Sequence, residues 1–142
     1  MMNGGPISWK SRRQDKVSLS TSEAEFVAAS QAGQEAIYLR ETLTDFGFSQ
    51  NKATLLYEDN SACVAMSENP VHRKISRHID IRKYYVGELV LNDFLKLVPL
   101  STHKMVADAL TKSLPSPAFV GHRQIMTGHA SFAAKLLRCF GV

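Results

Sequence analysis

A long stretch of helical periodicity lies between Ser20 and Gly47 and limits the folds open to this chain. Residues 20–25 contain two overlapping S-x-x-E patterns, in which a serine and the glutamate three residues later cap the first turn of a helix. Apolar or small residues then recur every three or four positions, at Phe26, Ala29, Gly33, Ile37 and Leu43. Gly47 is the residue type that commonly ends a helix. We therefore predict one long helix with a single buried stripe.

Shorter segments around this helix predict an α/β domain. Strands are expected at Ile7–Trp9, Val17–Ser20, Thr54–Asp59 and Phe94–Val98, with Trp9 and Tyr57 in the core. Helices are expected at Ala62–Met66, Ile79–Val90 and Lys104–Leu114, with a further helix near Ala130–Arg138. The order strand, helix, strand, helices, strand, helix is typical of the α/β class.

Composition excludes several other classes of protein. A chain of 142 residues with 44% hydrophobic residues is long and apolar enough for one folded domain. Cys63 and Cys139 are too few for a disulfide framework, so we expect buried thiols in a reducing compartment. The sequence contains no apolar run of about 20 residues and no signal-peptide core at its N-terminus. We therefore expect an intracellular protein, in the cytoplasm or the nucleus.

Three acidic residues, Glu25, Asp59 and Asp108, lie where predicted elements begin or end. Carboxylates held together by rigid elements can bind Mg²⁺ and support phosphodiester cleavage by two metal ions. Each residue also has a simpler interpretation. Glu25 can close a capping box with Ser22, Asp59 can belong to a turn, and Asp108 can pair with Lys112 four residues later.

A basic strip, which we define as residues 72–83, could contact nucleic acid. It contains five Lys or Arg residues against the single Asp80, and the whole chain has a net charge of +4. Such a strip can bind phosphates without reading sequence. The alternative is an ordinary solvated surface. The candidate substrate contacts are Asn60, Arg73, Lys74, Arg77, His78 and Arg82.

Four segments together resemble the ribonuclease H domain of copia-type retrotransposon polyproteins. They are ISWKSRRQ at 7–14, LSTSEAEFVAAS at 19–30, YEDNSACVAMSENPVHRKISRHIDIR at 57–82, and VADALTKSLP at 106–115. The resemblance implies a partial ribonuclease H-like domain over 1–117, followed by a tail at 118–142 that could be helical. It implies a mixed sheet flanked by helices, from which the first one or two strands are missing.

The resemblance also implies hydrolysis of the RNA strand of RNA–DNA hybrids with Mg²⁺, or with Mn²⁺ in its place. The partner implied in the ancestral element is the reverse transcriptase domain of the same polyprotein. The catalytic and metal-binding carboxylates fall on Glu25, Asp59 and Asp108. The resemblance assigns this role to Glu25 and not to Glu23. Helix geometry agrees, because residues two apart lie roughly 200° around the axis and cannot both face one site. The fourth carboxylate of the family lies on the first strand, which this chain lacks.

This departure leads us to expect an impaired enzyme. The isolated chain should cleave RNA–DNA hybrid undetectably or very slowly, and an apolar sheet edge should be exposed beside Leu55 and Tyr57. His103 stands where the family more often has an acidic or amide residue, and could assist product release or be an ordinary exposed histidine. Two other functions stay open. The chain could be a non-catalytic nucleic-acid-binding remnant, or a degenerate reading frame without function.

Overall fold

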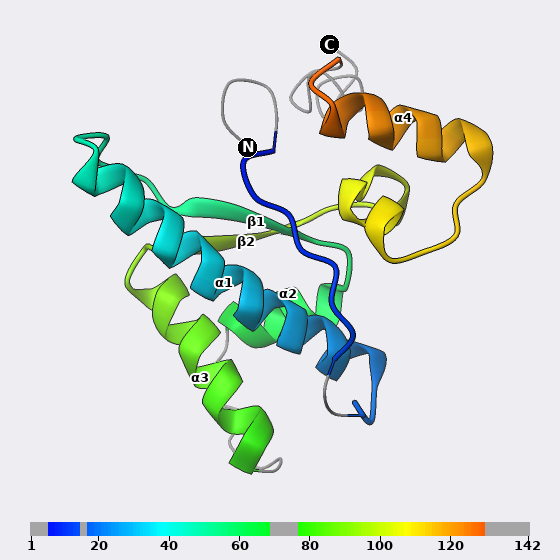
Figure 1. Cartoon of the computed structure of the whole chain (residues 1–142). Helices are drawn as coiled ribbons and strands as arrows, with labels where there is room; N and C mark the ends of the chain where they lie inside the picture. The colour runs from blue at the N-terminus through cyan, green and yellow to red at the C-terminus, as the bar shows by residue number, and fades with distance from the viewer. Residues whose placement is uncertain (1–5, 15–16, 69–76, 130–142) are drawn as a thin grey trace. The chain divides into compact units, whose positions relative to one another are not determined.

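The structure is a computed structural model that describes residues 6–14, 17–68 and 77–129 (Figure 1). The chain divides into two compact units. One comprises residues 16–100, and the other comprises residues 1–15 together with residues 101–142.

Helix α1, Thr21–Asp45, confirms the predicted long helix, and its start is fixed by one of the two capping patterns. Ser20 is the N-cap, and its side chain accepts a hydrogen bond of 3.1 Å from the backbone N–H of Glu23. The carboxylate of Glu23 in turn accepts a 2.8 Å bond from the N–H of Leu19. The helix therefore begins with a Ser20–Glu23 capping pair.

The end of α1 is a Schellman motif built around Gly47. Gly47 has a φ of 84°, a left-handed conformation that glycine adopts without steric cost. Its N–H donates to the carbonyl of Thr44 at 2.9 Å, and the N–H of Phe48 donates to the carbonyl of Leu43 at 2.8 Å. These two bonds satisfy carbonyls that the helix leaves unpaired, which is why the helix ends here.

The described sheet consists of two parallel strands, β1 (Thr54–Glu58) and β2 (Leu95–Pro99). Their register runs from Thr54 opposite Leu95 to Glu58 opposite Pro99. Parallel strands need a long crossover connection, and helices α2 (Ser61–Glu68) and α3 (Arg77–Leu91) lie between them in the chain (Figure 1). The predicted strands and helices of this region are confirmed, as is the α/β class.

The core of this unit forms where α1, α2 and α3 pack together and on the strands. Its buried members are Phe26, Ala29, Cys63, Val64, Val86, Leu89, Leu95 and Leu97. Gly33 on α1 lies so close to α3 that a Cβ atom placed there would be 3.0 Å from Cδ1 of Leu89. The periodic stripe read from the sequence is therefore the face that α1 buries.

Arg40 ties the end of α1 to the start of β1. Its guanidinium donates to the carbonyls of Gln50 at 2.6 Å and Lys52 at 2.7 Å, and to Oγ1 of Thr54 at 3.0 Å. The same group lies 5.7 Å from the centre of the Phe94 ring, within the range of a cation–π contact. One side chain thus fixes the connection that leads into β1.

We expect Arg40→Ala to lower the free energy of unfolding by about 2 kcal/mol, because three hydrogen bonds to a charged group are lost. Arg40→Lys should recover less than half of this loss, since a single ammonium cannot reproduce the planar arrangement of donors. Urea denaturation measures both values. Arg13→Ala, which removes an exposed arginine, is the control and should change stability by less than about 0.5 kcal/mol. Equal stabilities for Arg40→Ala and this control would contradict the assigned role.

The second unit contains short helical turns where the sequence predicted an α-helix over Lys104–Leu114. Two 3₁₀ helices, η1 (Thr102–Lys104) and η2 (Val106–Leu110), occupy this region, so the prediction of an α-helix is wrong. Met105 between them is extended, with φ −68° and ψ 99°, and Ser101 makes no side-chain capping bond. Without a cap or a continuous hydrogen-bond ladder, the segment forms separate tight turns.

Helix α4, Ser116–Met126, begins two residues before the tail at 118–142, for which the sequence left a helix open. Proline in its first turn is compatible with a helix start, because the missing N–H would have no partner there. His122 and Ile125, three residues apart on one face, are buried. The helix predicted near Ala130–Arg138 lies outside the described residues.

The predicted strands at Ile7–Trp9 and Val17–Ser20 are wrong, because the described residues from 6 to 20 contain no strand. Trp9 is 73% exposed, contrary to the prediction that it belongs to the core, and Tyr57 is half-buried. A strand persists only when a neighbouring strand pairs with its backbone groups, and sequence pattern alone does not identify that neighbour. Leu55 of β1 is about half-exposed.

Candidate functional site

Three carboxylates converge at the end of β1. One oxygen from each of Glu25, Glu58 and Asp59 lies within 4.8 Å of the others. Glu25 belongs to the second turn of α1, Glu58 is the last residue of β1, and Asp59 follows directly. Sites in open α/β sheets commonly form at the carboxyl ends of strands, which is where Asp59 was expected to act. The structure thus brings Glu25 and Asp59 together, as predicted.

This arrangement is chemically suited to a hard divalent cation. Mg²⁺ prefers oxygen ligands, and is usually bound through one or two carboxylates, water and substrate phosphates. Three negative groups this close repel one another, and a bound cation would remove that repulsion. The donor set therefore fits the ion that the sequence resemblance implied. When bound, such an ion supplies an activated water and stabilises a departing oxygen.

Glu58 is the member of the cluster that sequence reasoning missed. Its side chain accepts a 3.0 Å hydrogen bond from the backbone N–H of Asn60 and a second hydrogen bond from the Cys63 thiol. Burial raises the pKa of Glu58 above its usual value, and the charge of Asp59 raises the same pKa further. Successive strand residues point to opposite faces, so strand alternation alone gives no reason to expect Glu58 beside Asp59. Its position at the end of an apolar strand was the available signal.

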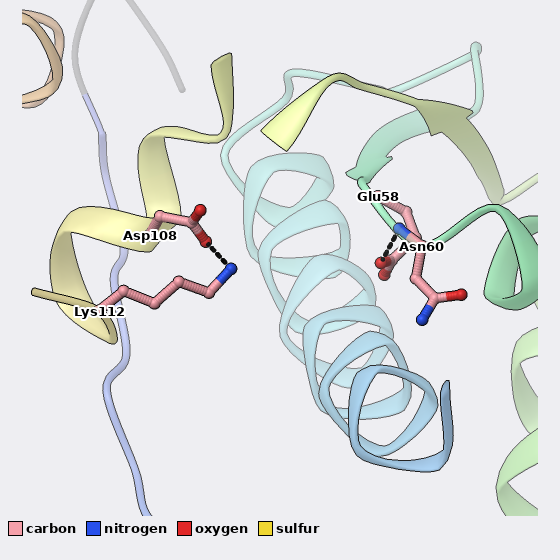
Figure 2. A network of polar contacts seen from close by, with 4 residues as sticks. All are labelled: Glu58, Asn60, Asp108 and Lys112. Atoms are coloured by element: carbon pink, nitrogen blue, oxygen red, sulfur yellow. Dashed lines mark hydrogen bonds and ion pairs between the residues drawn. The ribbon is translucent and has the colours of Figure 1, made fainter. Parts of the chain in front are cut away.

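Asn60 joins the carboxylate cluster to two helices. Its Oδ1 accepts hydrogen bonds from the backbone N–H groups of Ala62 at 3.0 Å and Cys63 at 3.2 Å, so Asn60 caps α2. Its Nδ2 donates to Oγ of Ser22 in the first turn of α1 at 3.4 Å. Figure 2 shows the bond from the Asn60 backbone to Glu58. Substrate binding by Asn60 stays a prediction.

Asp108 belongs to the other compact unit. It lies in η2, is 6% exposed, and its Oδ1 forms a 2.9 Å ion pair with Nζ of Lys112 (Figure 2). The pairing at four-residue spacing anticipated from the sequence is therefore formed. The binding of one ion by Asp108 together with Glu25 and Asp59 stays a prediction.

The basic strip is described only in part. Arg73 and Lys74 lie outside the described residues. Arg77 and His78 belong to α3, but the described side chains do not include theirs. Arg82 is half-exposed. Contact between these residues and nucleic acid stays a prediction.

Among the residues that the structure describes, no helix has the length and apolar composition needed to cross a membrane.

Comparison with known proteins finds retrovirus-related Pol polyproteins of plant transposons among the relatives of this chain. The retrovirus-related Pol polyprotein from transposon TNT 1-94 of Nicotiana tabacum is 36% identical over 129 residues, which is 91% of this chain. The corresponding polyproteins from transposons RE1 and RE2 of Arabidopsis thaliana are 33% and 32% identical over 114 residues, which is 80% of this chain. The chain spans 10% of the first relative and 8% of the other two. No protein-family profile and no solved structure matches.

These relatives show the class of protein to which the chain belongs. The chain is a region derived from a retrotransposon Pol polyprotein. More particularly, it belongs with the Pol polyproteins of plant copia-type transposons, which confirms the resemblance to copia-type retrotransposon polyproteins. Its assignment to the ribonuclease H domain of those polyproteins stays a prediction.

Proposed function

We propose that this Pol-derived region is a ribonuclease H-like domain that binds divalent cations through Glu25 and Asp59 and hydrolyses the RNA strand of RNA–DNA hybrids. The observation that carries the proposal is the approach of these two carboxylates, with Glu58, to within 4.8 Å at the end of β1. Asp108 is the third proposed ligand. Mg²⁺ is the proposed ion, with Mn²⁺ as a substitute.

The sequence motifs support the same reaction. Glu25 lies in the run LSTSEAEFVAAS and Asp59 in the run that begins YEDNSA, both of which resemble the ribonuclease H domain of this transposon branch. The basic strip supplies the charge to hold a phosphate backbone, and its contribution to affinity should fall steeply as salt rises. In this proposal the acidic residues bind the ion, and the basic strip binds the RNA–DNA duplex.

The proposal is tested by incubating the protein in excess over a labelled RNA–DNA hybrid, with Mg²⁺ and with chelator. We expect slow cleavage of the RNA strand that the chelator abolishes. Asp59→Asn and Asp108→Asn should each lower the rate by at least about 100-fold, since even outer partners of metal ligands commonly contribute 10- to 100-fold. Single-turnover rates from gel-resolved products measure the effect.

The matched control is Glu23→Gln, which removes a carboxylate two residues from Glu25 while keeping a residue type that suits the capping pair. Its rate should equal that of the wild-type protein. Cleavage that persists in chelator, or in Asp59→Asn at the wild-type rate, would show a contaminating nuclease and overturn the proposal.

A second outcome would favour the non-catalytic alternative. If the wild-type chain binds hybrid with a strong salt dependence but never cleaves it, the strip alone is functional. In that case Asp59→Asn should keep or increase affinity for the hybrid, because it removes a negative charge. A nuclease instead loses cleavage in that variant.

A further inference from the structure

We infer that Asn60 is a positioning residue that holds Asp59 against Glu25 before any cation binds. The inference rests on the proposed binding of a cation by those two carboxylates. It assigns Asn60 a role through other residues, in place of the direct contact with substrate predicted from the sequence.

The backbone on both sides of Asp59 is fixed by hydrogen bonds. Before it, the carbonyl of Glu58 accepts a 2.8 Å bond from the N–H of Leu100, just beyond β2. After it, the N–H of Asn60 donates to the Glu58 carboxylate at 3.0 Å (Figure 2). Asp59 therefore lies in a turn that is closed at each end, which limits the directions its side chain can take.

The side chain of Asn60 attaches this turn to the core. Its Oδ1 accepts from the N–H groups of Ala62 and Cys63, the first turn of α2. Cys63 is fully buried, so the first turn of α2 cannot shift without disturbing the core. Because Asn60 is hydrogen-bonded to this turn, the core also restrains the position of Asn60, the residue next to Asp59.

The nitrogen of the Asn60 side-chain amide contacts α1. Nδ2 of Asn60 lies 3.4 Å from Oγ of Ser22, and Ser22 is three residues before Glu25 on the same face of the helix. Ser22 is not the N-cap of α1, which is Ser20. The contact is long for a hydrogen bond, and we assign it an orienting role between the helix that carries Glu25 and the turn that carries Asp59.

A neutral positioning residue suits this place because the carboxylates repel one another. Without a cation, Glu25, Glu58 and Asp59 favour separation, and Asn60 opposes it through bonds that add no charge. A site held in its bound geometry binds more tightly, since less conformational freedom is lost on binding. The inference therefore predicts an effect of Asn60 on cation affinity although it is not a ligand.

The test is a titration of the full 142-residue chain with Mn²⁺, in which electron paramagnetic resonance measures the free ion. Asn60→Ala loses the capping bonds to α2 and the contact with Ser22. It should weaken Mn²⁺ binding by at least about 10-fold, the usual lower bound for residues that orient metal ligands. Asn60→Ser keeps a capping side chain but cannot reach Ser22, so we expect a loss of about threefold. Ser22→Ala removes only the contact with α1 and should match Asn60→Ser.

These substitutions leave the net charge unchanged, so a fall in affinity cannot come from charge. Val86→Ala, a truncation of a fully buried residue on α3, is the control for lost stability. It should lower the unfolding midpoint at least as much as Asn60→Ala while leaving Mn²⁺ affinity unchanged. A loss of Mn²⁺ binding in Val86→Ala equal to that in Asn60→Ala would show a general stability effect and overturn the inference.

The remaining outcomes separate the inference from the proposed function. If Asp59→Asn abolishes Mn²⁺ binding but Asn60→Ala stays within twofold of wild type, the inference fails and the proposed site stands. If the wild-type chain binds no Mn²⁺, both fail. Should Asn60→Ala not fold, Ser22→Ala carries the test, and an unchanged affinity in that variant overturns the inference.

Discussion

Phe26→Ala is expected to lower the free energy of unfolding by about 3–5 kcal/mol, the usual range for removing a fully buried aromatic side chain. Phe26 is 2% exposed and lies in the core cluster with residues from α2, α3 and β2. Its loss would leave a cavity at the point where α1 packs on the rest of its unit. Urea denaturation followed by circular dichroism measures the change.

The control for Phe26→Ala is Phe46→Ala, at the C-terminal end of the same helix. Phe46 is 74% exposed, so its truncation should change stability by less than about 0.5 kcal/mol. Equal losses in the two variants would contradict the assignment of the buried face of α1. Because Phe26 follows Glu25 directly, Phe26→Ala should also disturb the carboxylate cluster.

The second large effect concerns the reactivity of Cys63. This thiol is fully buried, and burial, together with the charge of Glu58 and a hydrogen bond to it, raises the pKa of Cys63 from 9.0 to about 12. Only the thiolate reacts with disulfide reagents, so the folded protein should react at least about 1000-fold more slowly than the unfolded chain at pH 8. The measurement is the rate of thiol release with an aromatic disulfide, with and without urea.

The experiment is done in a Cys139→Ser background, so that Cys63 is the only thiol that can react with the reagent. Rapid labelling in the absence of urea would show that α2 opens locally or that Cys63 is not buried. Slow labelling that becomes fast only across the unfolding transition would agree with the structure.

The same pKa gives a direction for the pH dependence of stability. The folded state raises the pKa of Cys63, so the unfolded chain releases this proton first as pH rises. The contribution of Cys63 is complete below about pH 9 and is lost progressively as the pH rises from 9.0 toward about 12. Cys63→Ala should therefore show a shallower loss of stability over this range than the wild-type protein.

Local signals in the sequence predicted much of the larger unit. Helix α1 begins at a capping pair and ends at a glycine, and both signals act within a few residues of chain. The strand before Asp59 and the helix capped by Asn60 are also set by neighbouring residues. The predicted meeting of Glu25 and Asp59 followed from the rule that sites form at strand ends, and from the resemblance to the transposon family.

The incorrect predictions of secondary structure share a different cause. The predicted strands near Trp9 and Leu19 had suitable residues but depended on a pairing partner elsewhere in the chain. The segment after Ser101 had a suitable capping residue, yet no side-chain bond forms there, and tight turns replace the α-helix. In each case the local pattern was compatible with more than one backbone state, and distant contacts selected between them.

The family, the α/β class, the bounds of α1 and two of the clustered carboxylates were predicted from the amino-acid sequence. These properties depend on motifs and on interactions between residues close together in the chain. Three features became visible only in the folded molecule: Glu58 lies beside Asp59 and Glu25, Asn60 contacts both α1 and α2, and Trp9 is exposed. Those outcomes depend on how separate elements pack, because the direction and burial of a side chain are set by neighbours that its own segment does not encode.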